Sequence, residues 1–183
     1  MKLVLDACVL YPNVMREMLL GAAKSGLFRP VWSARILEEW ARAAARLSEV
    51  QALQARGEVA LIKAAWPDAE HPPAPGLETR LWLPDSGDIH VLATAIDSSS
   101  DGIVTLNARD FPRGDLRAEG LERYDPDVLL RSYVDDAHDT ILDVAQTVLQ
   151  QANAGQGTWT LRGLLKKARL PRLGKALESK GAG

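Results

Sequence analysis

Apolar residues in the first third of the chain form two continuous runs separated by a stretch with helical spacing. Residues 2–9 are almost entirely apolar, and Asp6 is the only charge after Lys2, which is typical of a buried strand in a parallel sheet. Residues 27–32 form a second short run around Pro30 and predict another strand or a sheet edge. Between the runs, apolar residues recur every three or four positions and predict a helix that ends at Gly26.

The middle of the chain alternates between predicted helices and short strands. Ser33 is expected to cap a helix. The apolar residues that would share one face of that helix are Ile36, Leu37, Trp40, Ala41 and Ala44. The composition of residues 47–66 favours a further helix, and the prolines at 67 and in 71–76 predict a loop. The remaining elements expected here are a helix over 85–96 and strands over 102–106 and 121–124.

The last third is predicted to be helical. Residues 126–154 carry apolar side chains spaced for one buried stripe, namely Val128, Leu129, Tyr133, Ile141, Leu142, Ala145, Val148 and Leu149. Residues 158–177 predict two short helices separated by Pro171. The order of elements therefore predicts an α/β sandwich with a central parallel sheet, followed by C-terminal helices.

Composition limits the class of protein. A chain of 183 residues with 46% apolar residues can fill the core of one ordinary domain. Cys8 is the only cysteine, which excludes intrachain disulfides and zinc sites built on several thiolates, and indicates a reducing compartment. With no secretory leader and no membrane span expected, we predict a soluble cytoplasmic protein.

The charge is unevenly distributed. The net charge is −2, but residues 157–183 hold seven Lys or Arg residues against one acid, Glu178. Such a division suits an acidic site that holds cations together with a basic surface that meets a polyanion. A solvated basic helix face would explain the basic tail equally well.

Acidic side chains are expected to meet at the carboxyl edge of the sheet, where functional groups leave the apolar layers. Asp6 ends the first strand, and Asn107 and Asp110 follow a later one. The helices could bring further carboxylates to the same place, from Glu38, Glu39 and Asp88. Clustered carboxylates repel one another unless a cation neutralises them, and oxygen ligands without thiolates or paired histidines select Mg²⁺ or Mn²⁺.

Several of these residues also have a purely structural interpretation. Asp85 and Asp88 have the positions of a helix N-cap and a first-turn acid. Glu38 and Glu39 could both be solvated acids, and Asp110 could simply turn the chain. His90 is expected to pack rather than to bind a metal, and Cys8 is not expected to act as a nucleophile because no base is predicted beside it.

Four segments together resemble the PIN domain, the metal-dependent ribonuclease fold of VapC-type toxins. They are LVLD at 3–6, WSARILEE at 32–39, PDSGDIHVLA at 84–93 and IVTLNARDFP at 103–112. The resemblance implies a three-layer α/β/α sandwich. It divides the chain into a PIN-like nuclease domain over residues 1–130 and a helical C-terminal extension with a basic tail over 131–183.

The resemblance also implies roles for individual residues. It places Asp6, Glu39, Asp88 and Asp110 in the metal-binding and catalytic cluster, with Glu38 as a competitor for the position of Glu39. The residues expected to support the cluster are Asn107, Thr105 and Asp85. Asp85 would be either a further acid beside the metal or only a helix cap. Whether one or two ions act is left open.

The function implied is hydrolysis of RNA phosphodiester bonds with Mg²⁺ or Mn²⁺ by the toxin of a type II toxin–antitoxin pair. The partners implied are RNA, a cognate antitoxin protein and a second copy in a homodimer. The basic residues expected to grip the RNA backbone are Arg162, Lys166, Lys167, Arg169 and Arg172. The alternatives are a catalytically inactive PIN-like module that binds RNA or protein, and a phosphatase, which the missing nucleophile motif disfavours.

Overall fold

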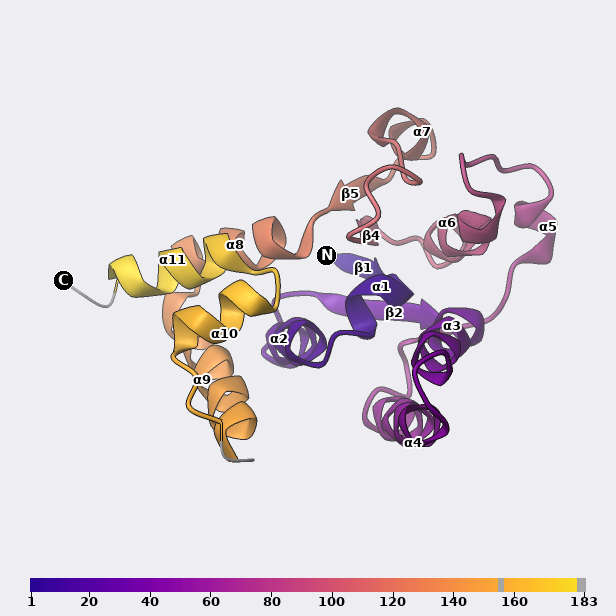
Figure 1. Ribbon diagram of the computed structural model, residues 1–183. Helices are drawn as coiled ribbons and strands as arrows, with labels where there is room; N and C mark the ends of the chain where they lie inside the picture. Colours follow the sequence, from indigo (N-terminus) through magenta and orange to yellow (C-terminus); the bar gives the residue numbers. More distant parts are fainter. Residues whose placement is uncertain (155–156, 181–183) are drawn as a thin grey trace. The chain divides into compact units, whose positions relative to one another are not determined.

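The computed structural model describes residues 1–154 and 157–180, and the chain divides into two compact units (Figure 1). Unit 1 comprises Met1–Tyr11 and Arg29–Tyr124, and unit 2 comprises Pro12–Phe28 and Asp125–Gly183. Residues 12–28, which were expected within the nuclease-like domain over 1–130, thus belong to the same unit as the C-terminal helices. The division into functional domains at residue 130 stays a prediction.

Unit 1 is built on a parallel sheet. In the described part of the chain, the strands are β1 (Lys2–Leu5), β2 (Arg29–Ser33), β3 (Glu70–His71), β4 (Gly102–Val104) and β5 (Glu122–Tyr124). Their order is β3-β2-β1-β4-β5, and every neighbouring pair is parallel. The central strands are fully covered, as their continuous apolar runs predict: Leu3, Val4, Leu5, Ile103 and Val104 are all 0% exposed.

Helices cover both faces of this sheet, which confirms the three-layer α/β/α prediction. The helical elements of unit 1 are α1 (Ala7–Leu10), α3 (Ala34–Ala45), α4 (Glu49–Ala65), α5 (Pro75–Glu78), η1 (Ser86–Asp88), α6 (Ile89–Asp97) and α7 (Arg113–Ala118). The connections from β1 through β2 to β3 place α1, α3 and α4 on one face, and the return to β4 and β5 places α6 and α7 on the other (Figure 1). Within the first layer, α4 packs on α3.

Three expectations for unit 1 were wrong in detail. The first strand ends at Leu5, and the apolar residues after Asp6 form helix α1, because a short apolar run fits a buried strand or a buried helix equally well. Residues 67–76 were expected to form a loop, but they contain strand β3 and the first residues of α5. The helix predicted over 85–96 begins as the 3₁₀ turn η1 and continues as α6. The predicted cap is confirmed: the Ser33 hydroxyl accepts from Ile36 N at 3.3 Å.

Unit 2 is helical. Its helices are α2 (Asn13–Lys24), α8 (Pro126–Asp136), α9 (His138–Ala154), α10 (Leu161–Lys167) and α11 (Pro171–Lys180). The helical pattern expected over 126–154 is confirmed as two helices separated at Ala137, but Val128, expected in the buried stripe, is 43% exposed. The two short helices before and after Pro171 are confirmed.

A buried carboxylate connects the C-terminal helix to the rest of unit 2. Asp127 on α8 is only 6% exposed. Its two carboxylate oxygens accept from the backbone N of Arg172 at 3.0 Å and of Leu173 at 2.9 Å. These N–H groups belong to the first turn of α11 and lack partners within the helix, so Asp127 caps α11 from another helix.

Candidate metal centre

The carboxyl ends of β1 and β4 bring two polar segments together. The strands are parallel neighbours, with Leu5 beside Val104. The ladder extends one step further, because Asp6 N donates to Val104 O at 3.1 Å. The side chains of Asp6 and Thr105 therefore meet just beyond the last apolar layer of the sheet, as the sequence predicts for this edge.

The Asp6 carboxylate is held in one orientation by two side chains. Asp6 is 6% exposed and stands at the N-cap position of α1, but it makes no side-chain capping bond there. Instead Oδ2 accepts from Thr105 Oγ1 at 2.7 Å and from Cys8 Sγ at 3.0 Å. Among the described residues no hydrogen bond involves Oδ1, so this oxygen is free to meet a ligand.

Cys8 acts in this arrangement as a neutral thiol. Burial and then the charge of Asp6 raise the pKa of the thiol to about 12. The sulfur also accepts from Leu106 N at 3.2 Å. A thiol with this pKa is not a nucleophile at neutral pH, in agreement with the sequence-based expectation.

Asn107 connects Asp6 to Asp88. Its backbone N donates to Thr105 Oγ1 at 2.9 Å, and its side-chain amide donates to Asp88 Oδ2 at 3.2 Å. Thr105 in turn donates to Asp6. A continuous set of hydrogen bonds thus runs from the end of β1, through the segment after β4, to the start of α6.

Three carboxylates lie together beside this network. One oxygen from each of Asp85, Asp88 and Asp110 falls within 4.8 Å of the others. Asp85 precedes η1 and Asp88 ends it, whereas Asp110 lies in the loop after β4. Asp85 is also a helix cap, because its Oδ1 accepts from Gly87 N at 2.8 Å. Asp85 therefore both caps the helical turn and lies in the group of three carboxylates.

The electrostatics of Asp88 show that the cluster is unfavourable without a cation. Partial burial, and then the charges of Asp6, Asp85, Asp110 and Glu39, raise the pKa of the Asp88 carboxyl to about 6. A divalent cation would remove this repulsion. All the groups present are hard oxygen donors, so the donor set fits Mg²⁺ or Mn²⁺.

The neighbouring glutamates of α3 lie in different surroundings. Glu38 is 49% exposed and pairs with Arg42 at 3.1 Å. Glu39 is 31% exposed, and its charge contributes to the raised pKa of Asp88. Of the two, Glu39 is the one whose charge acts on the acidic cluster, and the catalytic role that the resemblance implied for it stays a prediction.

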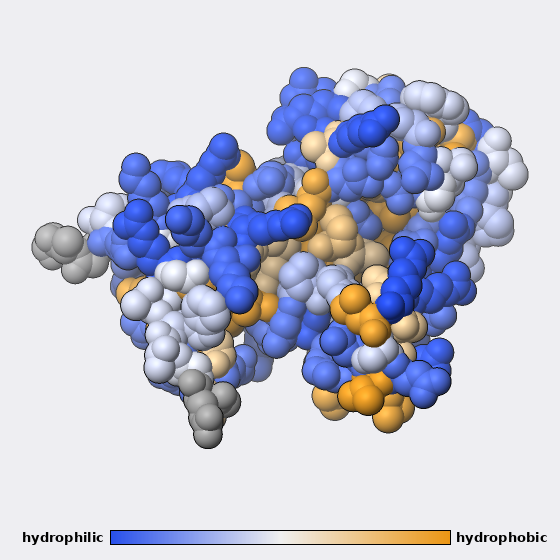
Figure 2. Space-filling view, in the orientation of Figure 1, coloured by the Kyte–Doolittle hydropathy of each residue, from blue (hydrophilic) through white to orange (hydrophobic). Residues whose placement is uncertain are grey.

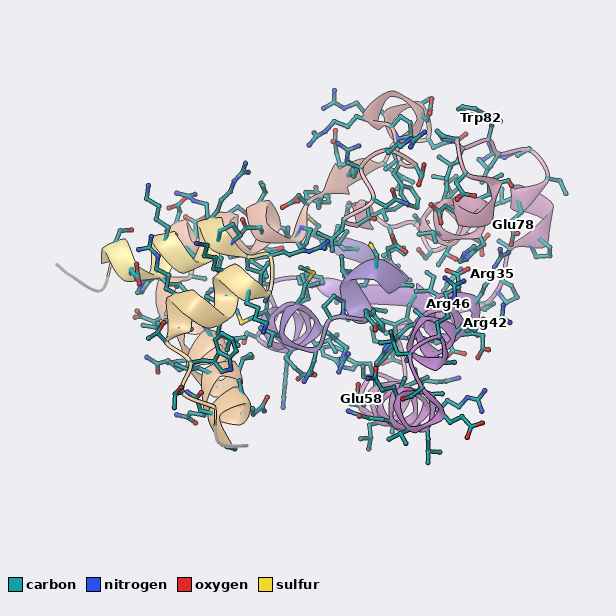
Figure 3. The ribbon with its side chains drawn as sticks, in the orientation of Figure 1. Arg35, Arg42, Arg46, Glu58, Glu78 and Trp82 are labelled. Carbon is teal, nitrogen blue, oxygen red and sulfur yellow. The ribbon has the colours of Figure 1, made fainter. Side chains whose placement is uncertain are left out.

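Two basic side chains lie beside Glu39, and neither was identified as functional from the sequence. His90 Nε2 lies 2.8 Å from Glu39 Oε1, and Arg35 Nε lies 3.4 Å from the same oxygen. Arg35 also donates to Gly87 O at 3.2 Å and lies 3.6 Å from Glu78 Oε2, so it connects α3 with α5 and η1 (Figure 3). His90 is 3% exposed, in agreement with the packing expected for it.

The basic residues predicted to bind RNA all lie in unit 2, with exposed side chains. They stand on α10, in the turn after it and at the start of α11. Arg162 pairs with Glu178 at 2.6 Å, and Lys167 Nζ lies 4.9 Å from the centroid of the Trp159 ring. Lys166, Arg169 and Arg172 complete the set.

No helix in the described part of the chain combines the length and the apolar character needed to cross a bilayer. Comparison with curated proteins and with solved structures gave no significant match. The sequence profile of the PIN domain, in contrast, matches residues 2–109, which is more than half of the chain and includes every residue of the acidic cluster except Asp110. The parallel sheet, the carboxylates at its carboxyl edge and this match together show that the chain belongs to the PIN domain family, whose members are generally nucleases.

Proposed function

We propose that this protein is a metal-dependent endoribonuclease that hydrolyses RNA phosphodiester bonds. The main support is the convergence of Asp85, Asp88 and Asp110 within 4.8 Å, with a pKa of about 6 for Asp88. A carboxyl whose pKa is raised by burial and by neighbouring carboxylates, as that of Asp88 is, is expected where a protein has evolved to hold a cation.

Asp88 and Asp110 would hold the ion, together with the free Oδ1 of Asp6. When bound, Mg²⁺ or Mn²⁺ supplies Lewis-acid chemistry to a phosphate oxygen and to water. Thr105 orients Asp6, and Asn107 orients Asp88, through the hydrogen bonds described above. Glu39 would hold a second ion or position the attacking water, and the close approach of His90 and Arg35 to its carboxylate supports either role.

The exposed cations of unit 2 would bind the RNA backbone. Lys166, Arg169 and Arg172 are available for phosphate contacts, and Trp159 with Lys167 offers a stacking surface for a base. These contacts carry little sequence information, so we expect affinity for RNA that falls steeply with salt. Arg162 is the weakest candidate, because Glu178 already neutralises it.

The resemblance to VapC-type toxins leads us to propose a toxin of a type II toxin–antitoxin pair, which acts on RNA in the cytoplasm. A cognate antitoxin and a second copy of the chain would be its protein partners. These assignments extend beyond the nuclease chemistry and can fail independently of it.

The test compares RNA cleavage by the wild type, Asp6→Asn and Glu38→Gln in Mg²⁺ or Mn²⁺. We expect Asp6→Asn to abolish cleavage and Glu38→Gln to retain it, because Glu38 points to Arg42. Calorimetric titration with Mn²⁺ accompanies the assay. A wild type that binds RNA but neither Mn²⁺ nor Mg²⁺, and does not cleave, would instead be the inactive binding module.

A further inference from the structure

Helix α4 has two apolar faces, of which only one is covered by the rest of unit 1. Ala55 and Ile62, seven positions apart, are 4% and 8% exposed and face the protein. On the opposite side, Val50, Leu53 and Leu61 are 76%, 75% and 72% exposed. Figure 2 shows this group as a hydrophobic patch over α4. Large aliphatic side chains grouped on one exposed helix face mark an interaction surface.

The exposed apolar stripe continues along the whole helix. The residues that follow one face at helical spacing are Val50, Leu53, Gly57, Leu61 and Ala64. Gly57 lies in the middle of the stripe, and a Cβ placed on it would meet no described atom within 4 Å. A glycine inside a helix lowers helix stability, but it allows another backbone to approach closely.

We propose that this α4 stripe pairs with the same stripe of a second copy of the chain, in an antiparallel arrangement with the two-fold axis at Gly57. The stripe is self-complementary about this point. Leu53 of one copy would pack on Leu61 of the other, Val50 would lie opposite Ala64, and the two Gly57 backbones would be adjacent. A two-fold interface requires this matching of one surface with itself.

The charges at the helix ends favour the antiparallel direction. α4 has Glu49 in its first turn and Lys63 in its last turn. Lys63 Nζ already lies 2.8 Å from Glu70 Oε2 of its own chain, so an antiparallel pair would bring Glu49 of one copy toward this ion pair of the other. An antiparallel pair also opposes the two helix dipoles, whereas a parallel pair would align them. The inference gives a surface to the homodimer proposed above, and it does not depend on nuclease activity.

Sedimentation analysis over a range of concentrations tests the pairing. One pair of 17-residue helices is smaller than a standard interface, so we expect a dimer with a dissociation constant of roughly 1–100 μM. Leu53→Glu should weaken the dimer at least about tenfold. Trp82→Glu, which removes another exposed apolar side chain (67%) of the same unit, should leave the dimer unchanged (Figure 3).

Disulfide cross-linking tests the position of the axis. The only native cysteine is Cys8, so the wild type serves as the background. Gly57→Cys should cross-link two copies rapidly under mild oxidation, and Glu58→Cys, turned by about 100° around the helix, should cross-link much more slowly. A wild type that stays monomeric at several hundred micromolar, a dimer that survives Leu53→Glu, or equal cross-linking rates would overturn the proposal. RNA cleavage measured on the same variants separates this result from the proposed activity.

Discussion

His90 Nε2 lies 2.8 Å from Oε1 of Glu39, although the two residues stand on helices that cover opposite faces of the sheet. The imidazole is 3% exposed, and among the described residues neither ring nitrogen of His90 makes a hydrogen bond, so the ring meets Glu39 through the close approach of Nε2 to Oε1 alone. The charge of Glu39 in turn acts on Asp88 in the acidic cluster. We propose that His90 positions Glu39 through this contact, and the proposal predicts a specific pattern of variant activities.

Replacement of His90 by Leu should lower the rate of RNA cleavage about 10–100-fold. This range is typical of residues that contact a metal-ligating side chain and hold its orientation. His90→Gln keeps an N–H group near the position of Nε2 and should recover most of the activity. Steady-state kinetics with thermal melts as a fold control check this. If Leu and Gln lower the activity equally, the role of His90 is only to fill space.

The two adjacent glutamates should differ sharply. Glu39→Gln removes a charge that acts on Asp88, so we expect at least about a tenfold loss of cleavage and a lower pKa of Asp88. Glu38→Gln breaks an exposed pair with Arg42 and should change neither activity nor stability by more than about 0.5 kcal/mol. RNA cleavage assays on the Glu39→Gln and Glu38→Gln variants test this difference. A larger loss of cleavage in Glu38→Gln than in Glu39→Gln would assign the catalytic role to Glu38.

The raised pKa of Asp88 predicts a pH-dependent stability of the metal-free protein. The pKa is about 6 in the folded state against 3.8 ordinarily, so between these values the folded protein binds more protons than the unfolded chain. Stability therefore falls as pH rises from about 4 to 6. Asp88→Asn should stabilise the metal-free protein at pH 7 by ~1 kcal/mol, because solvent screening of a half-buried group reduces the full effect.

Scanning calorimetry in EDTA at pH 4 and pH 7 measures this difference. The stabilisation by Asp88→Asn should be present at pH 7 and nearly absent at pH 4. With Mn²⁺ the order should reverse at pH 7, because the wild type gains stability from the ion and the variant loses a ligand. A difference between wild type and variant that does not vary with pH would contradict the electrostatic account of Asp88.

Thr105 should be required for both stability and metal binding. Thr105→Val keeps the shape of a side chain that is 2% exposed, but removes the donor to Asp6 and the acceptor for Asn107 N. We expect a loss of about 1–3 kcal/mol in the free energy of unfolding and about tenfold weaker Mn²⁺ binding. Thr105→Ser retains the hydroxyl and serves as the control, and denaturant titration with calorimetry measures both quantities. Unchanged Mn²⁺ affinity in the Val variant would show that Thr105 does not orient Asp6.

Gly102 is the glycine of the sheet where a side chain cannot be accommodated. A Cβ on Gly102 would lie 2.2 Å from Glu122 O and 2.7 Å from Tyr124 Cε2, so β4 and β5 would have to separate. Gly102→Ala should lower the free energy of unfolding by about 2–3 kcal/mol. Gly114→Ala, which meets no described atom within 4 Å, should be neutral or slightly stabilising. Equal effects of both substitutions in denaturant titrations would contradict the close packing of these strands.

The sequence alone determined the layered fold and most of the acidic cluster. The continuous apolar run before Asp6 suits a strand buried on both faces, and the last residue of such a strand reaches the sheet edge, which is where Asp6 lies. Helical spacing of apolar residues likewise predicted α3 with its Ser33 cap. Boundaries were less well predicted, as at residues 7–10, because short apolar runs carry no periodicity that separates strand from helix.

Only the tertiary structure decided which polar groups meet. His90 with Glu39, Cys8 with the oriented oxygen of Asp6, and Asp127 with the start of α11 are contacts between side chains whose sequence positions carry no distinguishing pattern. The physical reason is that local propensity and periodicity act over a few residues, whereas these contacts depend on how separate elements pack. The same holds for the apolar stripe of α4, because periodicity cannot tell which of two apolar faces the protein covers and which it leaves exposed.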